Sequence, residues 1–265
     1  MVNILISGYY GFDNIGDESI LRTLVSSLRE HIPDCSLTVL SHNPTSTREK
    51  YGVEAVDRMS PMAILRAVKK CDMLISGGGS LLQDVTSSKS LHYYLSIIRC
   101  AEFFHKKVFI YSQGIGPIDR PGNRRAAAAA LKRADGIVVR DERSASLLEE
   151  IGIARDKVVI TADPVIRMKK PDGDVGAEIL RKAGVSLDGR LTVGWAIRER
   201  DTDSRFVKEL LRSIQMMKDK YNAQSVLIPF HYEEDGEVCR HIAAQLPDDT
   251  AVCLNEKYLS EDMLS

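Results

Sequence analysis

Short apolar runs alternate with amphipathic segments along the chain, and this alternation predicts the strands and helices of a parallel α/β sheet. The runs are too uniformly hydrophobic for a sheet with one solvent-facing side, so we expect helices on both faces. In the first part of the chain, the predicted strands are residues 2–7, 36–41, 72–76, 107–113, 136–140 and 157–162. The predicted helices there are residues 17–31, 60–70, 90–105, 122–133 and 142–151.

The polar segment 167–176, with Pro171 and two glycines, interrupts this pattern and is typical of a linker. The pattern then resumes with strands at 191–198, 225–231 and 251–255 and helices at 202–220 and 234–245. We therefore predict two Rossmann-like, doubly wound parallel-sheet domains at residues 1–170 and 191–265, joined by a linker region at 171–190. Because such domains normally have five or six strands, we expect the second domain to be incomplete in this chain.

Composition narrows the class of protein. The 265 residues are 44% hydrophobic and 28% charged, as in a soluble globular protein with a sizeable core. A net charge of -1 gives no general attraction to nucleic acid or anionic membranes, so we expect no nucleic-acid partner. The five scattered cysteines predict neither a disulfide nor a metal site. Because the sequence shows no signal peptide and no apolar run near the ~20 residues of a membrane span, we predict a cytoplasmic protein.

The stretch SGYYGFDNIGDE, residues 7–18, places glycines at a strand-to-helix turn without the G-x-G-x-x-G spacing of a dinucleotide loop. Asp17 and Glu18 already meet the positive end of the following helix and would repel a phosphate. Carboxylates, amides and phenols suit neutral hydroxyls, so we predict a site for a sugar or another polyol. Its candidate residues are Tyr9, Tyr10, Asp13, Asn14 and Asp17. The structural alternative is helix capping by Asn14, with ordinary acids in the first turn.

Two later glycine-rich turns favour an anionic ligand. In SGGGSLLQD, residues 76–84, no neighbouring acid in the sequence crowds the backbone amides of Gly77, Gly78, Gly79 and Ser80. The alternative is a purely steric role for the glycines. In SQGIGP, residues 112–117, the turn would hold Gln113 at the mouth of a crevice.

Charged side chains close several predicted strands. Arg140 follows the strand at 136–140 and can bind a carboxylate or phosphate, unless it forms a salt bridge with Asp141 or Glu142. Arg198 and His231 end two strands of the second domain, where they would bind an anion and move a proton. For His231 the alternative is a hydrogen-bonded surface residue. The stretch TADP, residues 161–164, is interpreted as a turn.

In this order, GYYGFDNIGDE, GGGSLLQD, YSQGIGP, VRDERS and TADP closely resemble the polysaccharide pyruvyl transferase family, most nearly its CsaB branch. The resemblance covers essentially the whole chain and implies a GT-B-like fold with the active site between two Rossmann-like domains. It implies a transferase that moves pyruvate from phosphoenolpyruvate to two hydroxyls of a sugar as a 4,6-ketal, with no cofactor and no metal. In the CsaB branch the acceptor is N-acetylmannosamine in a lipid-linked precursor of a secondary cell-wall polymer, which anchors S-layer proteins.

The resemblance also implies roles for the candidate residues. Arg140 and Arg198 would clamp phosphoenolpyruvate, the Gly77 to Ser80 turn and Gln113 would donate hydrogen bonds to it, and the opening turn would bind the acceptor sugar. His231 is the candidate catalytic residue, in an auxiliary role. The family's MRLH-like segment, which carries its general acid, has no match here, so we expect the general acid beyond Ser265. The lipid-linked acceptor places the protein at the inner face of the cell membrane, with peripheral association through that substrate.

Two other functions are compatible with the same sequence. A GT-B glycosyltransferase would use a nucleotide sugar in place of phosphoenolpyruvate. A non-catalytic saccharide-binding protein would use the same fold without the chemistry. A Rossmann dehydrogenase fits less well, because the first turn has the wrong glycine spacing.

Overall fold

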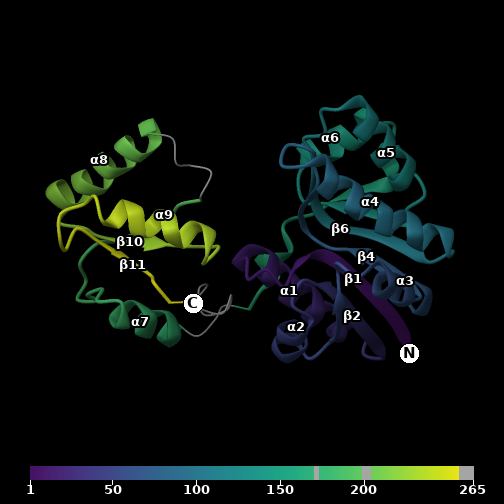
Figure 1. Ribbon diagram of the computed structural model, residues 1–265, viewed down its shortest axis with the longest axis horizontal. Helices are drawn as coiled ribbons and strands as arrows, with labels where there is room; N and C mark the ends of the chain where they lie inside the picture. Colours follow the sequence, from purple (N-terminus) through teal and green to yellow (C-terminus); the bar gives the residue numbers. More distant parts are fainter. Residues whose placement is uncertain (170–172, 199–203, 257–265) are drawn as a thin grey trace. The chain divides into compact units, whose positions relative to one another are not determined.

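The computed structural model describes residues 1–169, 173–198 and 204–256, which form two compact units (Figure 1). The first unit comprises Met1–Phe12 and Asp17–Met168. The second comprises the short segment Asp13–Gly16 and the described residues after Met168.

A parallel sheet forms the centre of the first unit. Its strands run in the order β3-β2-β1-β4-β6-β7-β8, and β5 pairs with β6. The bounds are β1 (Val2–Tyr10), β2 (Cys35–Ser41), β3 (Glu54–Asp57), β4 (Met73–Ser76), β5 (Gly79–Leu82), β6 (Lys107–Ile115), β7 (Gly136–Val139) and β8 (Val158–Ile160). Since every pairing is parallel, the carboxyl ends of neighbouring strands meet at one edge of the sheet.

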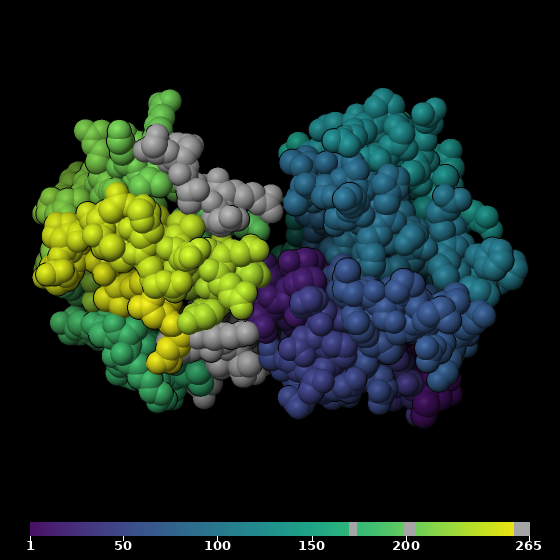
Figure 2. Space-filling view, in the orientation of Figure 1, coloured from purple at the N-terminus to yellow at the C-terminus, as the bar shows by residue number. Residues whose placement is uncertain are grey.

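Helices cover both faces of this sheet, as the apolar strands predict. They are α1 (Ile15–His31), α2 (Pro44–Tyr51), α3 (Pro61–Lys70), α4 (Ser88–Phe103), α5 (Pro121–Leu131) and α6 (Glu142–Glu150), with short 3-10 helices at Arg155–Lys157 and Pro164–Arg167. Along β1, Leu5 belongs to the hydrophobic cluster that includes residues of α3 to α6, whereas Ile4 and Ile6 belong to the cluster formed with α1 and α2 on the other face. Figure 2 shows one face of the molecule in a space-filling view, coloured by residue number. No described helix has both the length and the apolar composition of a membrane span.

Three strands or helices of the first unit, α2, β3 and β5, were not predicted. Strand β5 lies in the SGGGSLLQD stretch, which was interpreted from the sequence as a turn. Helix α2 is polar, and only Thr47 and Tyr51 are buried on it, so it has almost no apolar periodicity. Its signals are local instead: Asn43 accepts a hydrogen bond from the Ser46 amide, and the helix ends at Gly52 in the left-handed region. Strand β3 has four residues, too few for a distinct alternation.

The second unit contains a three-stranded parallel sheet in the order β11-β10-β9. Its described elements are α7 (Gly173–Lys182), β9 (Thr192–Ala196), α8 (Ser204–Tyr221), β10 (Gln224–Ile228), α9 (Glu234–Ala243) and β11 (Ala251–Cys253). Helix α7 corrects the linker prediction for 171–190, because Ile179 and Leu180 pack against buried Val226 and Leu254 of this unit. Residues 170–172, which include Pro171, and residues 202–203 of the predicted helix lie outside the described residues.

Tyr10 is part of the packing of β1. Its side chain is 0% exposed, and a Cβ added to Gly8 would lie 2.3 Å from its ring. A Cβ added to Gly77, beyond the end of β4, would lie 2.2 Å from its hydroxyl oxygen. Burial raises the Tyr10 pKa well above 10.0, so the phenol stays neutral. The prediction that Tyr10 binds a sugar is therefore wrong, because the core occupies its whole surface.

Asp84 organises the start of α5. Its carboxylate accepts hydrogen bonds from the Asp119 amide (2.9 Å), the Arg120 amide (3.1 Å) and the Asn123 side-chain amide (2.7 Å). Burial opposes its ionisation, but these bonds outweigh burial and hold the Asp84 pKa below its ordinary 3.8. The last residue of the SGGGSLLQD motif thus fixes the connection from β6 to α5.

The Asp84 contacts predict a stability that depends on pH. A depressed folded-state pKa contributes stability that is present above the unfolded pKa and is lost as pH falls through the folded pKa. At pH 7 we expect Asp84→Asn to lower the free energy of unfolding by about 2 kcal/mol, since an amide nitrogen would face donors. Urea titrations at several pH values measure this, and the difference between the two proteins should shrink as the pH falls through the lowered folded-state pKa of Asp84. A difference independent of pH would contradict the assignment.

The Tyr10 contacts predict a coupled pair of substitutions. Because the Tyr10 hydroxyl has no hydrogen-bond partner among the described residues, Tyr10→Phe should leave the free energy of unfolding unchanged or raise it by up to ~1 kcal/mol. Gly77→Ala should lower it by about 1–3 kcal/mol through overpacking. The alanine should cost less in the Tyr10→Phe background, where the oxygen it meets is gone. Additive effects in chemical denaturation would contradict this packing.

Candidate functional site

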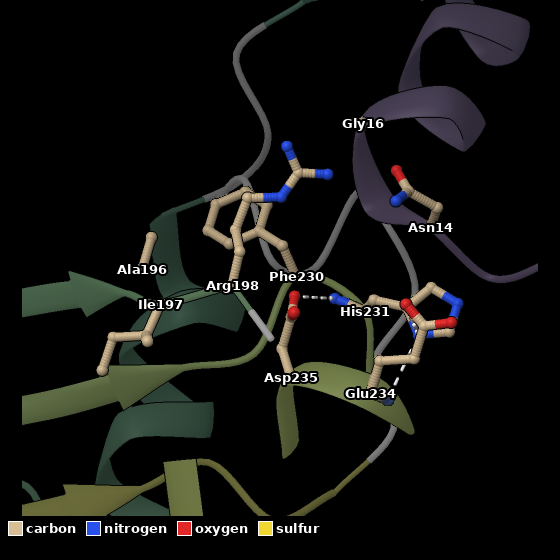
Figure 3. A pocket seen from close by; sticks show the side chains of 9 residues that line it. All are labelled: Asn14, Gly16, Ala196, Ile197, Arg198, Phe230, His231, Glu234 and Asp235. Atoms are coloured by element: carbon tan, nitrogen blue, oxygen red, sulfur yellow. Dashed lines mark hydrogen bonds and ion pairs between the residues drawn. The ribbon is translucent and has the colours of Figure 1, made fainter. Parts of the chain in front are cut away.

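A pocket of about 350 Å³ lies in the second unit and brings three candidate residues together. Asn14, Arg198 and His231 come from distant parts of the sequence, and all three line the pocket (Figure 3). The other lining residues are Gly16, Ala196, Ile197, Phe230, Glu234 and Asp235. The Arg198 guanidinium and the Asn14 amide extend toward one another, whereas the His231 imidazole lies beside Glu234 (Figure 3).

His231 is held by the first turn of α9. Its backbone amide donates a hydrogen bond to the Asp235 carboxylate (2.8 Å), and the Asp235 amide donates to the His231 carbonyl (2.9 Å). The Glu234 amide donates to His231 Nδ1 (3.3 Å), so the neutral ring carries its proton on Nε2. Since Nδ1 is occupied, Nε2 is the nitrogen that can exchange a proton with a ligand.

The segment Asp13–Gly16 contributes the pocket's amide. Asp13 has a φ of 56°, in the left-handed region that Asn and Asp tolerate better than other non-glycine residues. The Ile15 amide donates to the Phe230 carbonyl (3.2 Å), and Asn14 forms an antiparallel bridge with His231. These backbone contacts place the Asn14 side chain at the pocket, where an amide can both donate to and accept from a ligand.

Arg198 supplies the positive charge of the pocket. It lies two residues after the end of β9, is exposed and forms no ion pair with any carboxylate in the described part of the chain. A guanidinium with uncommitted donors can bind a carboxylate or a phosphate in a bidentate manner.

Arg140, in the first unit, shares part of its guanidinium with protein acceptors. Its Nη1 donates to Asp163 Oδ2 (2.9 Å) and its Nη2 donates to Ser80 Oγ (2.9 Å), while its Nε lies 3.8 Å from Asp141 Oδ2. The guanidinium lies over Gly114, where an added Cβ would come within 2.9 Å of it. The main partner is thus Asp163 of the TADP stretch, a residue that the sequence suggested only as part of a turn.

The glycine turn at 77–79 is not an open set of amides. All three glycines are buried, the Gly77 amide donates to the Ser7 carbonyl (2.8 Å), and Gly79 begins β5. A Cβ on Gly79 would lie 2.9 Å from Asp17 Oδ1, so an acid does crowd this turn. The anion site predicted at Gly77, Gly78 and Gly79 is therefore corrected to close packing, and Ser80 is the exposed residue that remains.

Gln113 also differs from its prediction. It is 0% exposed, and its side-chain nitrogen donates to both the carbonyl (3.0 Å) and the hydroxyl (2.8 Å) of Ser76. Its amide hydrogens are therefore used within the sheet and do not reach the mouth of a crevice. The physical reason is the register of β6, which pairs Gln113 with Gly79 on one side and Val139 on the other.

The two acids after Gly16 separate into different environments. Glu18 is buried, accepts a hydrogen bond from the Gly11 amide (2.8 Å) and accepts another from the Tyr51 hydroxyl. It therefore has a structural role and fixes the turn, through contacts that the sequence did not predict. Asp17 is partly exposed, so only this acid is accessible to a ligand.

Arg58 is a buried cation that the sequence prediction missed. It is 7% exposed, and its Nη1 donates to the Gly8 carbonyl (2.9 Å). Its guanidinium lies over the rings of Tyr93 (4.7 Å), Phe12 (5.1 Å), Tyr94 (5.6 Å) and Tyr9 (5.7 Å). Tyr9 in turn stacks on Phe12 at 4.0 Å. Arg58 directly follows β3, as Arg140 directly follows β7. The sequence would have indicated Arg58 by this position at a strand end if β3 had been predicted.

No group of three or more metal-ligating side chains occurs among the described residues. The functional groups at the described pocket are a guanidinium, an imidazole, an amide and carboxylates.

Several solved structures share this fold. The Anabaena protein HepE, in complex with UDP-glucose, aligns over 96% of this chain and 68% of its own, with 12% identity and a TM-score of 0.61. The UDP-GlcNAc 2-epimerase of Neisseria meningitidis, bound to UDP-GlcNAc, aligns over 100% of this chain and 75% of its own, with 13% identity and a TM-score of 0.63. At such identities the likeness shows the fold alone, and it confirms the predicted Rossmann-like α/β fold of the GT-B type.

Sequence comparison assigns the family. The amylovoran biosynthesis protein AmsJ of Erwinia amylovora is 24% identical over 239 residues, an alignment that covers 75% of this chain. The chain spans 57% of the length of AmsJ. The family model described as polysaccharide pyruvyl transferase matches residues 14–263, a range that includes Asn14, Arg140, Arg198 and His231. The chain therefore belongs to the polysaccharide pyruvyl transferase family.

Proposed function

We propose that this chain acts in pyruvyl transfer from phosphoenolpyruvate to a sugar during polysaccharide biosynthesis, and that the second unit's pocket binds the donor. The observation that carries the proposal is the meeting of Asn14, Arg198 and His231 in one pocket of a chain from this family. Phosphoenolpyruvate has a carboxylate and a phosphate, and Arg198 is suited to either group. We also propose that Arg140, in the first unit, binds an anionic group of the donor.

The reaction makes two demands on the site. A proton adds to the C3 methylene of the donor, which leaves an oxocarbenium-like centre at C2 for the first sugar hydroxyl to attack. The bond from C2 to the phosphate oxygen then breaks, and the second hydroxyl closes the ketal. The two hydroxyl protons balance the proton gained by C3 and the one that leaves with phosphate. The site must therefore neutralise an anion and move protons.

His231 can move protons, and Asn14 can orient the sugar. With Nδ1 accepting from the Glu234 amide, His231 Nε2 can donate a proton to the reactants or accept one from a hydroxyl. Asn14 can hydrogen-bond a sugar hydroxyl in either direction. We place the acceptor with Asn14, Asp13 and Asp17, and we propose N-acetylmannosamine of a lipid-linked cell-wall polymer precursor, pyruvylated as a 4,6-ketal.

A nucleotide sugar is the competing ligand, because HepE and the Neisseria epimerase were solved with UDP-glucose and UDP-GlcNAc. Isothermal titration with phosphoenolpyruvate, UDP-glucose and UDP-GlcNAc separates the two proposals. Binding of phosphoenolpyruvate together with acceptor-dependent phosphate release supports pyruvyl transfer. Binding of a UDP-sugar alone would replace it with a glycosyltransferase.

Loss of the guanidinium should weaken donor binding. We expect Arg198→Met to raise the dissociation constant of phosphoenolpyruvate about tenfold to a hundredfold, the equivalent of ~1.5–3 kcal/mol for a charge-assisted contact. Arg212→Met is the matched control, since Arg212 is an exposed arginine on α8 outside the pocket. Isothermal titration measures both variants, and equal affinities would remove Arg198 from the donor site.

Loss of the imidazole should slow the chemistry without loosening the fold. The Asn side-chain oxygen is two bonds from Cβ, as Nδ1 is, and can still accept from the Glu234 amide, so His231→Asn preserves the first turn of α9 while removing the proton carrier. We expect kcat for phosphate release to fall about a hundredfold, with the dissociation constant of phosphoenolpyruvate nearly unchanged. An unchanged kcat would leave His231 with the structural role that its contacts with α9 already provide.

A further inference from the structure

Each carboxylate oxygen of Asp163 accepts a hydrogen bond. Oδ1 accepts a hydrogen bond from the Val165 amide (3.1 Å) at the start of the 3-10 helix Pro164–Arg167, and Oδ2 accepts from Arg140 Nη1 (2.9 Å). The first contact anchors the carboxylate to the backbone. The second contact therefore holds the guanidinium in one place.

Two further contacts restrict Arg140. Ser80 Oγ accepts from Nη2 at 2.9 Å, and Gly114 leaves room for the guanidinium to lie directly over the backbone of β6. A guanidinium carries five N–H donors, of which Asp163 and Ser80 each take one. The Arg140 side chain is 30% exposed, so donors remain for a ligand to reach.

We propose that Asp163 is a positioning residue, which orients Arg140 for an anionic group of the donor; this inference rests on the proposed function. An arginine already held in one rotamer loses less conformational entropy when a ligand binds. The negative charge of Asp163 weakens the attraction of Arg140 for an anion, so the proposal requires that orientation outweigh this repulsion. A substitution that removes the charge and keeps the helix cap decides between the two effects.

Asp163→Asn is that substitution. Its side-chain oxygen can still accept from Val165, while its amide nitrogen would face Arg140 and cannot accept the bond. We expect the dissociation constant of phosphoenolpyruvate in isothermal titration to rise about tenfold, with kcat for phosphate release changed by less than about threefold. In the Arg140→Met background the same substitution should have no further effect on donor affinity.

Asp141→Asn is the matched control. Asp141 also begins a helix, accepting from the Ser144 amide at 2.8 Å, but its other oxygen lies 3.8 Å from Arg140 Nε. We expect near wild-type donor affinity in this variant. If Asp163→Asn leaves the affinity unchanged or tightens it, or weakens it equally in the Arg140→Met background, the positioning role is overturned.

The hold of Asp163 on Arg140 can also be measured without the donor, through the chemical reactivity of Arg140. Phenylglyoxal modifies accessible arginines, and peptide mass spectrometry can follow Arg140 alone. We expect Arg140 to react several-fold faster in Asp163→Asn than in the wild type, and an equal rate would overturn the positioning role. If the wild type neither binds nor consumes phosphoenolpyruvate while this rate difference is present, the proposed function fails and the hold of Asp163 on Arg140 stands.

Discussion

The first unit depends on close contacts at glycines near the carboxyl ends of its central strands. At these positions a residue with a side chain would collide with a neighbouring residue. Tyr10 lies against Gly8 and Gly77, and Arg140 lies over Gly114. At each of these glycines an added Cβ would meet a neighbouring atom within 3.0 Å, which no ordinary packing tolerates. These glycines lie in stretches that resemble ligand-binding loops in the sequence, but in the structure they allow close packing within the protein. The polar groups that remain exposed nearby belong to side chains.

The three arginines that follow strands show how differently one residue type can be used. Arg58 is buried among four aromatic rings and holds the Gly8 carbonyl, so it stabilises the opening turn. Arg140 is partly exposed and ion-paired with Asp163. Arg198 is exposed and forms no ion pair with the described residues. Binding capacity follows from these surroundings, because a guanidinium already satisfied by protein acceptors has fewer donors for a ligand.

Proteins with this fold have several activities, so the function of this chain must be inferred from the residues of its site. HepE and the Neisseria epimerase share its architecture and were solved with UDP-sugars, while its sequence belongs to a pyruvyl transferase family. A shared architecture of this kind does not define a substrate. The groups at the pocket, a guanidinium, an imidazole and an amide, are compatible with a small anion and with sugar hydroxyls.

The sequence by itself determined the parallel α/β class, the position of most helices and strands, and the family, because apolar periodicity and ordered motifs are local properties of the chain. It missed α2 and β3, which have little apolar pattern, and it interpreted β5 as part of a glycine-rich turn and α7 as a linker. It also identified Asn14 in the opening turn, and Arg198 and His231 at strand ends, but it did not bring them together.

Only the tertiary structure decided which of these residues are available to a ligand. It buried Tyr10 and Gln113, closed the glycine turn and paired Arg140 with Asp163. The physical reason is that burial and hydrogen-bond partnership depend on neighbours distant in sequence, which local patterns do not encode.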